Sequence, residues 1–275
     1  MGELPLIIFT LFMQAAIGTI LFIMVAKLFQ KEQDFKLAGL VAGFLSVIGI
    51  LASLLHLGTP THALNALSNL GSSWLSREIL LSGTFMVLAV IYAILVYVKP
   101  TAKTVVNTIG WAAGVVGLVA VFMMAKSYTS TSVPVWQGAD AFIEFFATMV
   151  ILGIVILFVT SFKDLNLKVS KYLALAVFLI VAVQIAFAVP HYIHLGLMGG
   201  AGAVSAELLD GMNVLVVVQW LLLILGSGYL LFTRVQEGKM NAAKYYIVGT
   251  ALCIALIVGR YLFYAISIAS RVGLS

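Results

Sequence analysis

The chain has 275 residues, of which 63% are hydrophobic and only 9% are charged. Soluble domains carry about 25% charged residues, so this composition excludes a water-soluble fold and indicates an all-α, polytopic integral membrane protein. The net charge of +5 does not indicate nucleic-acid binding, because the basic residues follow the predicted membrane topology. The single cysteine, Cys253, excludes an intramolecular disulfide and a thiolate metal site within an isolated subunit.

Eight apolar runs are each long enough to cross the hydrocarbon core, which takes about 20 residues. We expect one transmembrane domain over residues 1–275, and no cleavable signal peptide, because the N-terminus MGELP lacks a basic segment and precedes a full span. The predicted helices cover approximately residues 4–27, 37–57, 78–98, 105–126, 141–162, 172–192, 212–233 and 245–267.

The connections between these runs alternate in charge. Eleven of the 15 basic residues lie in the odd-numbered connections, which include Lys31, Lys99, Lys163 and Lys239. By the positive-inside rule, these lysine-rich loops face the cytoplasm and both termini lie outside.

The candidate chemistry gathers on the predicted outer side. All four histidines and six of the ten acidic residues fall there, as do the longer loops 58–77, 127–140 and 193–211. Pro190 is expected to end or kink the sixth helix, and the Gly/Ala-rich run after His194 to form a flexible cover or a short interfacial segment. Function is therefore expected at the outer face.

The stretch from Leu54 to Glu78 is the polar crossing on which this interpretation depends. Gly58 ends the second apolar run, and Pro60 suits the first turn of a short helix lying along the membrane surface. Ser73 or Ser76 is expected to cap the third spanning helix, with Glu78 in its positive first turn.

His56 and Glu78 are the candidate proton acceptors for a lipid-soluble quinol. A neutral imidazole or a carboxylate can take a proton from a quinol hydroxyl. The plainer alternatives are an interfacial histidine bonded to a loop carbonyl and a carboxylate that stabilises a helix start. Arg77 is expected to anchor the protein at the interface, with pairing to a neighbouring acid as the alternative. Arg260 either lines a polar pocket or extends to the membrane surface.

His191 and His194 can share a helical face and, with His56, could ligate a haem or a metal. Every histidine lies at a helix end, however, which is unlike the facing pairs of b-type cytochromes. No phosphate-binding loop, nucleophile elbow or metal-ligand spacing is present in the sequence. We therefore expect no metal, haem or iron–sulfur cluster in this subunit.

Four segments resemble the membrane-anchor subunit of the dimethyl sulfoxide reductase family. HLGTPTHALNALSNLGSSWLSREI, which starts at His56, is similar to that family's signature block. LPLIIFTLFMQAAIG, VPVWQ and GRYLFYAISIASRVG resemble its first helix, its Val-Pro-x-Trp segment and its C-terminal ending, in the same order.

The resemblance implies eight helices in two four-helix bundles, as in the polysulfide reductase membrane subunit, within a prokaryotic inner membrane. It further implies oxidation of menaquinol near the outer face. An iron–sulfur subunit and a molybdopterin catalytic subunit docked there would receive the electrons. His56 and Glu78 would be the quinol-site residues, and Gly58 and Pro60 would shape the loop above them. Arg77 is also a quinol-binding candidate, and Arg260 would be a weaker one.

Two other interpretations remain open from the residues alone. A b-type cytochrome subunit would show a haem absorption spectrum. A secondary transporter would show repeat symmetry and broken helices meeting at mid-membrane, whereas the titratable residues here gather at one edge.

Overall fold

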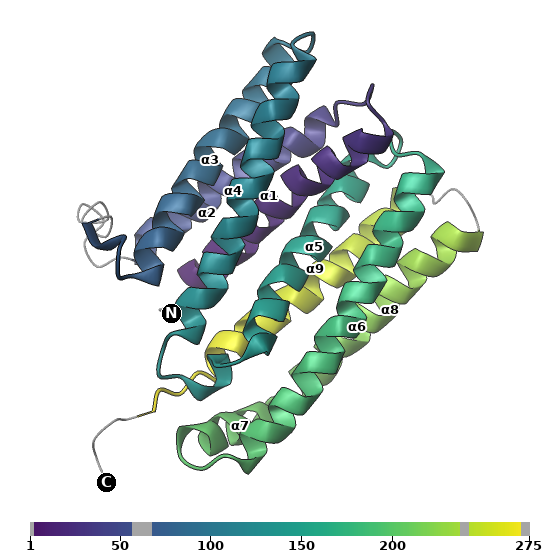
Figure 1. Cartoon of the computed structure of the whole chain (residues 1–275). Helices are drawn as coiled ribbons and strands as arrows, with labels where there is room; N and C mark the ends of the chain where they lie inside the picture. The colour runs from purple at the N-terminus through teal and green to yellow at the C-terminus, as the bar shows by residue number, and fades with distance from the viewer. Residues whose placement is uncertain (1–2, 57–67, 237–241, 271–275) are drawn as a thin grey trace.

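The computed structural model describes residues 3–56, 68–236 and 242–270, and these are almost entirely helical (Figure 1). The long helices are α1 (Leu4–Phe29), α2 (Lys36–His56), α3 (Trp74–Val98), α4 (Lys103–Thr129), α5 (Ala139–Ser161), α6 (Leu167–Leu197), α8 (Asn213–Gln236) and α9 (Ala242–Ala265). A 3₁₀ turn, η2 (Pro134–Trp136), precedes α5, and a short helix, α7 (Ala201–Gly211), follows α6.

The all-α, membrane-spanning fold class is confirmed. Eight helices within the described ranges are long and apolar enough to cross a membrane, and they correspond one to one with the eight predicted runs. Each carries an 18-residue window of high hydropathy with at most two charged residues. The largest differences from the predicted ends are at α6, which extends by a full turn at each end.

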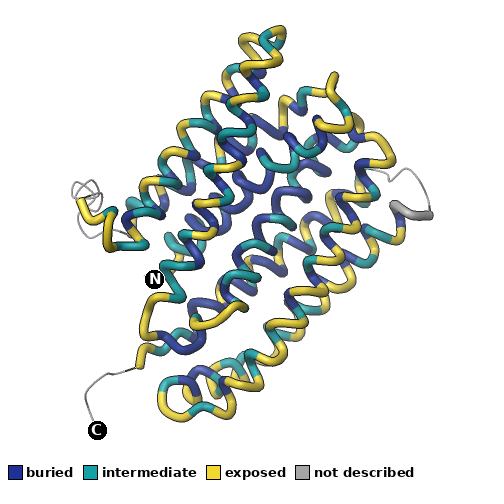
Figure 2. The backbone as a smooth tube through the Cα atoms, in the orientation of Figure 1, coloured by how far each residue is buried: buried dark blue, intermediate teal, exposed yellow. Residues whose placement is uncertain are grey.

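The helices form two four-helix bundles, as Figure 1 shows. One bundle contains α1, α2, α3 and α4, and the other contains α5, α6, α8 and α9. The central contact between the bundles is made by α1 against α5, and these two helices are the most buried of the eight (Figure 2).

A pair of glycines allows this central contact. A Cβ atom on Gly18 would lie 2.0 Å from the Met149 carbonyl oxygen, and one on Gly153 would lie 2.2 Å from the Gly18 carbonyl carbon. Real side chains do not approach so closely, so the backbones of α1 and α5 pack together only because both positions lack a side chain. Small residues serve the same purpose at other membrane helix interfaces.

The structure distinguishes between the alternatives expected around the end of the sixth helix. Pro190 does not end the helix, because α6 continues through it to Leu197. A proline removes only one backbone hydrogen bond, and α6 packs against both α5 and α8. The Gly/Ala-rich run that follows contains a defined short helix, α7, which agrees with the expected short segment rather than with a flexible cover.

The connections between the helices lie at two opposite ends of the molecule. The C-terminal end of α2, the N-terminal end of α3, η2, α7 and the C-terminal end of α9 lie at one end, which we call the α7 end (Figure 1). The lysine-rich connections that the structure describes lie at the opposite end, where Lys27 pairs with Asp34 at 3.6 Å and Lys103 pairs with Glu32. The predicted placement of both termini outside would make the α7 end the outer face.

Candidate functional site

Glu78 lies inside the first bundle, and its predicted position in the first turn of the third helix is wrong. Ser73 is the N-cap, its side chain accepts a hydrogen bond from the Ser76 backbone N–H at 3.2 Å, and α3 begins at Trp74. Glu78 therefore follows the first turn, and only 3% of its surface is exposed. Its carboxyl group hydrogen-bonds with the Ser127 side chain. The helix dipole alone does not explain a buried carboxyl group at this depth.

A pair of tyrosines joins this region to the second bundle. The hydroxyl groups of Tyr128 in α4 and Tyr264 in α9 are 2.6 Å apart. Both rings lie close enough to Glu78 to interact with it electrostatically, and Tyr264 also hydrogen-bonds with the Thr10 side chain of α1. Glu78 is thus connected, through neighbouring hydroxyl groups, to the interface between the two bundles.

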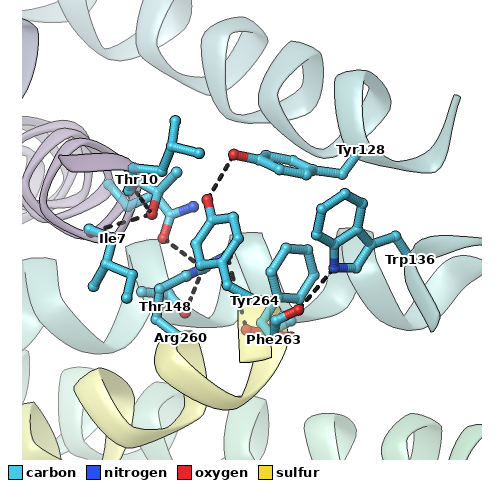
Figure 3. A network of polar contacts seen from close by, with 11 residues as sticks. Ile7, Thr10, Tyr128, Trp136, Thr148, Arg260, Phe263 and Tyr264 are labelled. Atoms are coloured by element: carbon cyan, nitrogen blue, oxygen red, sulfur yellow. Dashed lines mark hydrogen bonds and ion pairs between the residues drawn. The ribbon is translucent and has the colours of Figure 1, made fainter. Parts of the chain in front are cut away.

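Arg260 occupies the centre of that interface, so the prediction that it lines a polar region is favoured over an extension to the membrane surface. Its side chain is fully enclosed, with 1% of the residue exposed. One terminal nitrogen, Nη2, donates to Gln14 Oε1 at 3.1 Å and lies 3.5 Å from Thr148 Oγ1, while Nη1 lies 3.8 Å from Glu144 Oε1 (Figure 3). The helices α1, α5 and α9 all contribute to this environment.

Aromatic rings pack around the guanidinium group. Its central carbon lies 4.1 Å from the ring centre of Phe145 and 5.1 Å from that of Phe263. Trp136 of η2 stacks on Phe263 at 5.3 Å and donates from its indole nitrogen to the Phe263 carbonyl oxygen at 2.8 Å (Figure 3). The VPVWQ segment therefore closes this cluster at the α7 end.

Arg77 is the predicted anchor, and the structure places it on the backbone before α3 rather than beside Glu78. Its Nε donates to the Leu70 carbonyl oxygen at 2.8 Å, and its Nη2 donates to the Gly71 carbonyl oxygen at 2.7 Å. The guanidinium group also covers the Trp74 ring at 4.4 Å. Arg77 thus fixes the segment that enters α3.

The remaining predicted residues can be placed only in part. His56 is the last residue of α2, which puts its backbone at the α7 end, but its side chain is not described. Gly58 and Pro60 lie outside the described residues, as does the predicted surface helix that follows them.

His191 does not share a metal-ligand group with His194 or His56 in the described part of the protein, where no cluster of three or more His, Cys, Asp or Glu side chains could hold a metal ion. Instead, its Nδ1 lies 3.1 Å from Asp140 Oδ1 and its Nε2 lies 3.1 Å from the Val135 carbonyl oxygen. The histidine therefore connects α6 to the beginning of α5.

Sequence reasoning missed the residues that link the two bundles. Tyr128, Tyr264 and Thr10 come from three helices that are distant in sequence, and nothing in their local spacing brings them together. In the sequence, Glu144 could be placed only on the predicted outer side of the membrane. In the structure, its position on α5 also brings it to Arg260. The available signal was the presence of polar residues within the first two turns or the last turn of otherwise apolar helices.

Comparisons with known proteins agree with this architecture. The sequence matches the family described as DMSO reductase anchor subunit (DmsC) over residues 1–266, so the protein belongs to that family. It is 31% identical over 157 residues to the C subunit of the anaerobic dimethyl sulfoxide reductase of Haemophilus influenzae, covering 55% of this protein and 56% of that relative.

Two relatives from Escherichia coli K12 give similar results. The C subunit of its anaerobic dimethyl sulfoxide reductase is 32% identical over 157 residues, and the anaerobic dimethyl sulfoxide reductase subunit YnfH is 27% identical over 156 residues. Each match covers 55% of this protein and 55% of the relative, so the matched region spans about half the length of these curated relatives.

Proposed function

We propose that this protein is the quinol-oxidising membrane anchor of a molybdopterin oxidoreductase complex. Menaquinol would enter from the bilayer and place its head group at the α7 end, between the end of α2 and the beginning of α3. His56 and Glu78 would accept its two protons. The observation that carries the proposal is the buried Glu78 carboxyl group, whose hydrogen-bond partner among the described residues is the uncharged Ser127 hydroxyl group.

The free-energy cost of burying an ionisable side chain in a membrane supports a functional role for Glu78. Ionisable side chains within membrane segments are expensive to bury and are generally kept for a function. Glu78 forms no ion pair within the described residues, whereas the nearest arginine in sequence, Arg77, is held by backbone carbonyl groups. A carboxyl group that is not held in an ion pair can gain and lose a proton.

The two electrons would pass to an iron–sulfur subunit docked on the α7 end and then to a molybdopterin catalytic subunit. The names of the relatives support this assembly, since they are subunits of dimethyl sulfoxide reductases. The α7 end would face the outside of a prokaryotic inner membrane, with both termini on that side. Protons and electrons would leave on the same side, so this subunit would move no charge across the membrane.

The test is quinol oxidation by the assembled complex in membranes, with native, His56→Ala and Glu78→Gln anchors. General acid–base groups typically contribute about 100-fold or more to a rate. We therefore expect each variant to lower turnover by about 100-fold while the complex still assembles. Asp164→Asn is the matched control, because this exposed carboxylate lies after α5 at the end of the molecule opposite the proposed docking surface. Native turnover in Glu78→Gln would refute the assignment of Glu78.

A further inference from the structure

A second polar site lies inside the bundle of α5, α6, α8 and α9. Its small cavity, of about 40 Å³, is bounded by Asp140 and Glu144 of α5, His191 of α6, and Gln219 of α8, among other residues. A buried water occupies roughly 10–15 Å³ on this measure, so the cavity accommodates two or three waters but no quinone ring.

Hydrogen bonding at His191 requires a proton between this residue and Asp140. The Val135 carbonyl oxygen can only accept, so the facing His191 Nε2 must carry a hydrogen. A neutral imidazole would then direct the lone pair of Nδ1 toward Asp140 Oδ1, only 3.1 Å away. Two acceptors do not meet at this distance without a hydrogen between them. The pair therefore holds one proton, on either the imidazole or the carboxyl group.

Local backbone geometry allows this contact. Gly138 has a φ of +137°, and a Cβ atom there would lie 2.6 Å from Asp140 Oδ1 and 3.9 Å from His191 Nδ1. A side chain at this position would therefore both strain the backbone and displace the Asp140 carboxyl group.

Unpartnered polar atoms indicate that the cavity contains water. Gln184 lines the cavity with 5% of its surface exposed, and its Oε1 has no hydrogen-bond donor within the described part of the protein. Arg260 does not line the cavity but contacts Glu144, which does, and its Nη1 and Nε have no hydrogen-bond partner among those residues. Buried polar atoms of this kind are normally satisfied, and internal water is the usual partner.

Spacing on α5 aligns the acids along the cavity. Asp140 and Glu144 are four residues apart, so they lie on one face of the helix, with Asp140 nearer the α7 end. The charged and titratable groups around the cavity come from three helices: Asp140 and Glu144 from α5, His191, Tyr192 and His194 from α6, and Arg260 from α9. The fourth helix, α8, contributes the uncharged Gln219 and Trp220.

We infer that this cavity is a proton-release site, in which Glu144, internal water and the Asp140–His191 pair pass protons from the bundle interface to the α7 end. The inference rests on the proposed quinol oxidation as the source of the protons. In each transfer, the O–H bond of the Glu144 carboxyl group breaks as an O–H bond forms on water. That water gives a proton to the Asp140–His191 pair, and the pair releases its own proton to the solvent. The Glu144 carboxylate then regains a proton that quinol oxidation releases at the bundle interface, so the charge of the site is unchanged after each cycle. No electrons are transferred within the site.

The test uses the assembled complex in membranes with Asp140→Asn and His191→Gln anchors. Both replacements keep a hydrogen-bonding side chain but cannot hold the mobile proton. We expect quinol turnover to fall about tenfold, the solvent deuterium isotope effect to rise, and the KM for quinol to change less than twofold. Added imidazole or formic acid should restore part of the rate, because small weak acids can replace a lost proton carrier but not a lost structural contact. Asp164→Asn, an exposed change at the lysine-rich end opposite α7, should behave as native.

Two results would overturn the inference. One is native turnover in both variants, and the other is a loss of turnover that weak acids do not restore and that is matched by lost binding of a quinol-analogue inhibitor. Inhibitor binding to the native complex separates this inference from the proposed function. If the native complex does not bind the inhibitor, the proposed quinol site itself is refuted. If it binds normally and both variants turn over at the native rate, only the proton-release role is refuted.

Discussion

Replacement of Arg260 with methionine is expected to destabilise the contact between the two bundles by about 3 kcal/mol. The variant loses the charge-assisted hydrogen bond to Gln14, the longer contact with Thr148, the ion pair with Glu144 and the cation–π contacts. Removal of one partner from a buried ion pair costs about 3–5 kcal/mol, and a charged hydrogen bond about 1.5–3 kcal/mol. Because 26% of the Glu144 side chain is exposed, water can compensate for part of the loss, which favours the lower end of this range.

The assay is equilibrium unfolding of the purified protein in mixed micelles, followed by helix content. Arg260→Met, Glu144→Gln and the double variant complete a double-mutant cycle. Since the carboxylate that loses its partner is absent from the double variant, we expect a coupling energy of about 1–2 kcal/mol. Stability of Arg260→Met within about 0.5 kcal/mol of native would refute the conclusion that this side chain joins the bundles.

Three further changes test other parts of the fold. Gly153→Ala should lower the free energy of unfolding by about 1–3 kcal/mol in the same assay, because the added methyl group forces α1 and α5 apart. The control, Gly83→Ala, has no neighbouring atom within 4 Å of its added Cβ and should be neutral or slightly stabilising. Equal effects of the two changes would contradict the close contact between α1 and α5. Arg77→Ala should release the segment before α3 and increase its proteolysis, and unchanged cleavage would show that the two carbonyl contacts are dispensable. Lys103 lowers the pKa of Glu32 below its ordinary value of 4.5 through a hydrogen bond and its positive charge. Any stability from this exposed pair is therefore complete above pH 4.5 and lost as the pH falls through the lower, folded pKa. Glu32→Gln should abolish that acid dependence, and an unchanged pH profile would exclude the pair as its source.

The membrane fold could be predicted because each span is a property of a continuous segment. Twenty apolar residues between charged connections predict a helix across the bilayer, whatever its neighbours are. The continuation of α6 through Pro190 could not be predicted, because the effect of the proline depends on the packing of α6 against α5 and α8, which a local pattern does not contain. The same applies to the contact between Gly18 and Gly153, which needs two helices in register.

The candidate site could be predicted only where one segment carried the signal. Glu78 stands out in sequence as an acid at the edge of an apolar run, but its burial depends on how α3 packs against its neighbours, which the sequence does not show. Arg260 and Glu144 are each visible as charges within spans, but their pairing depends on how α5 and α9 pack. Tyr128 and Tyr264 carry no charge and could be identified only from the structure.

The most direct test of the central claim is a titration of a fluorescent quinol-analogue inhibitor into membranes that contain the intact complex, with native, His56→Ala and Glu78→Gln anchors. We expect stoichiometric binding to the native anchor, loss of binding with His56→Ala, and binding weakened by at least tenfold with Glu78→Gln. Absence of binding to the native anchor, in a complex shown to be assembled, would contradict the proposal that this protein contains the quinol site.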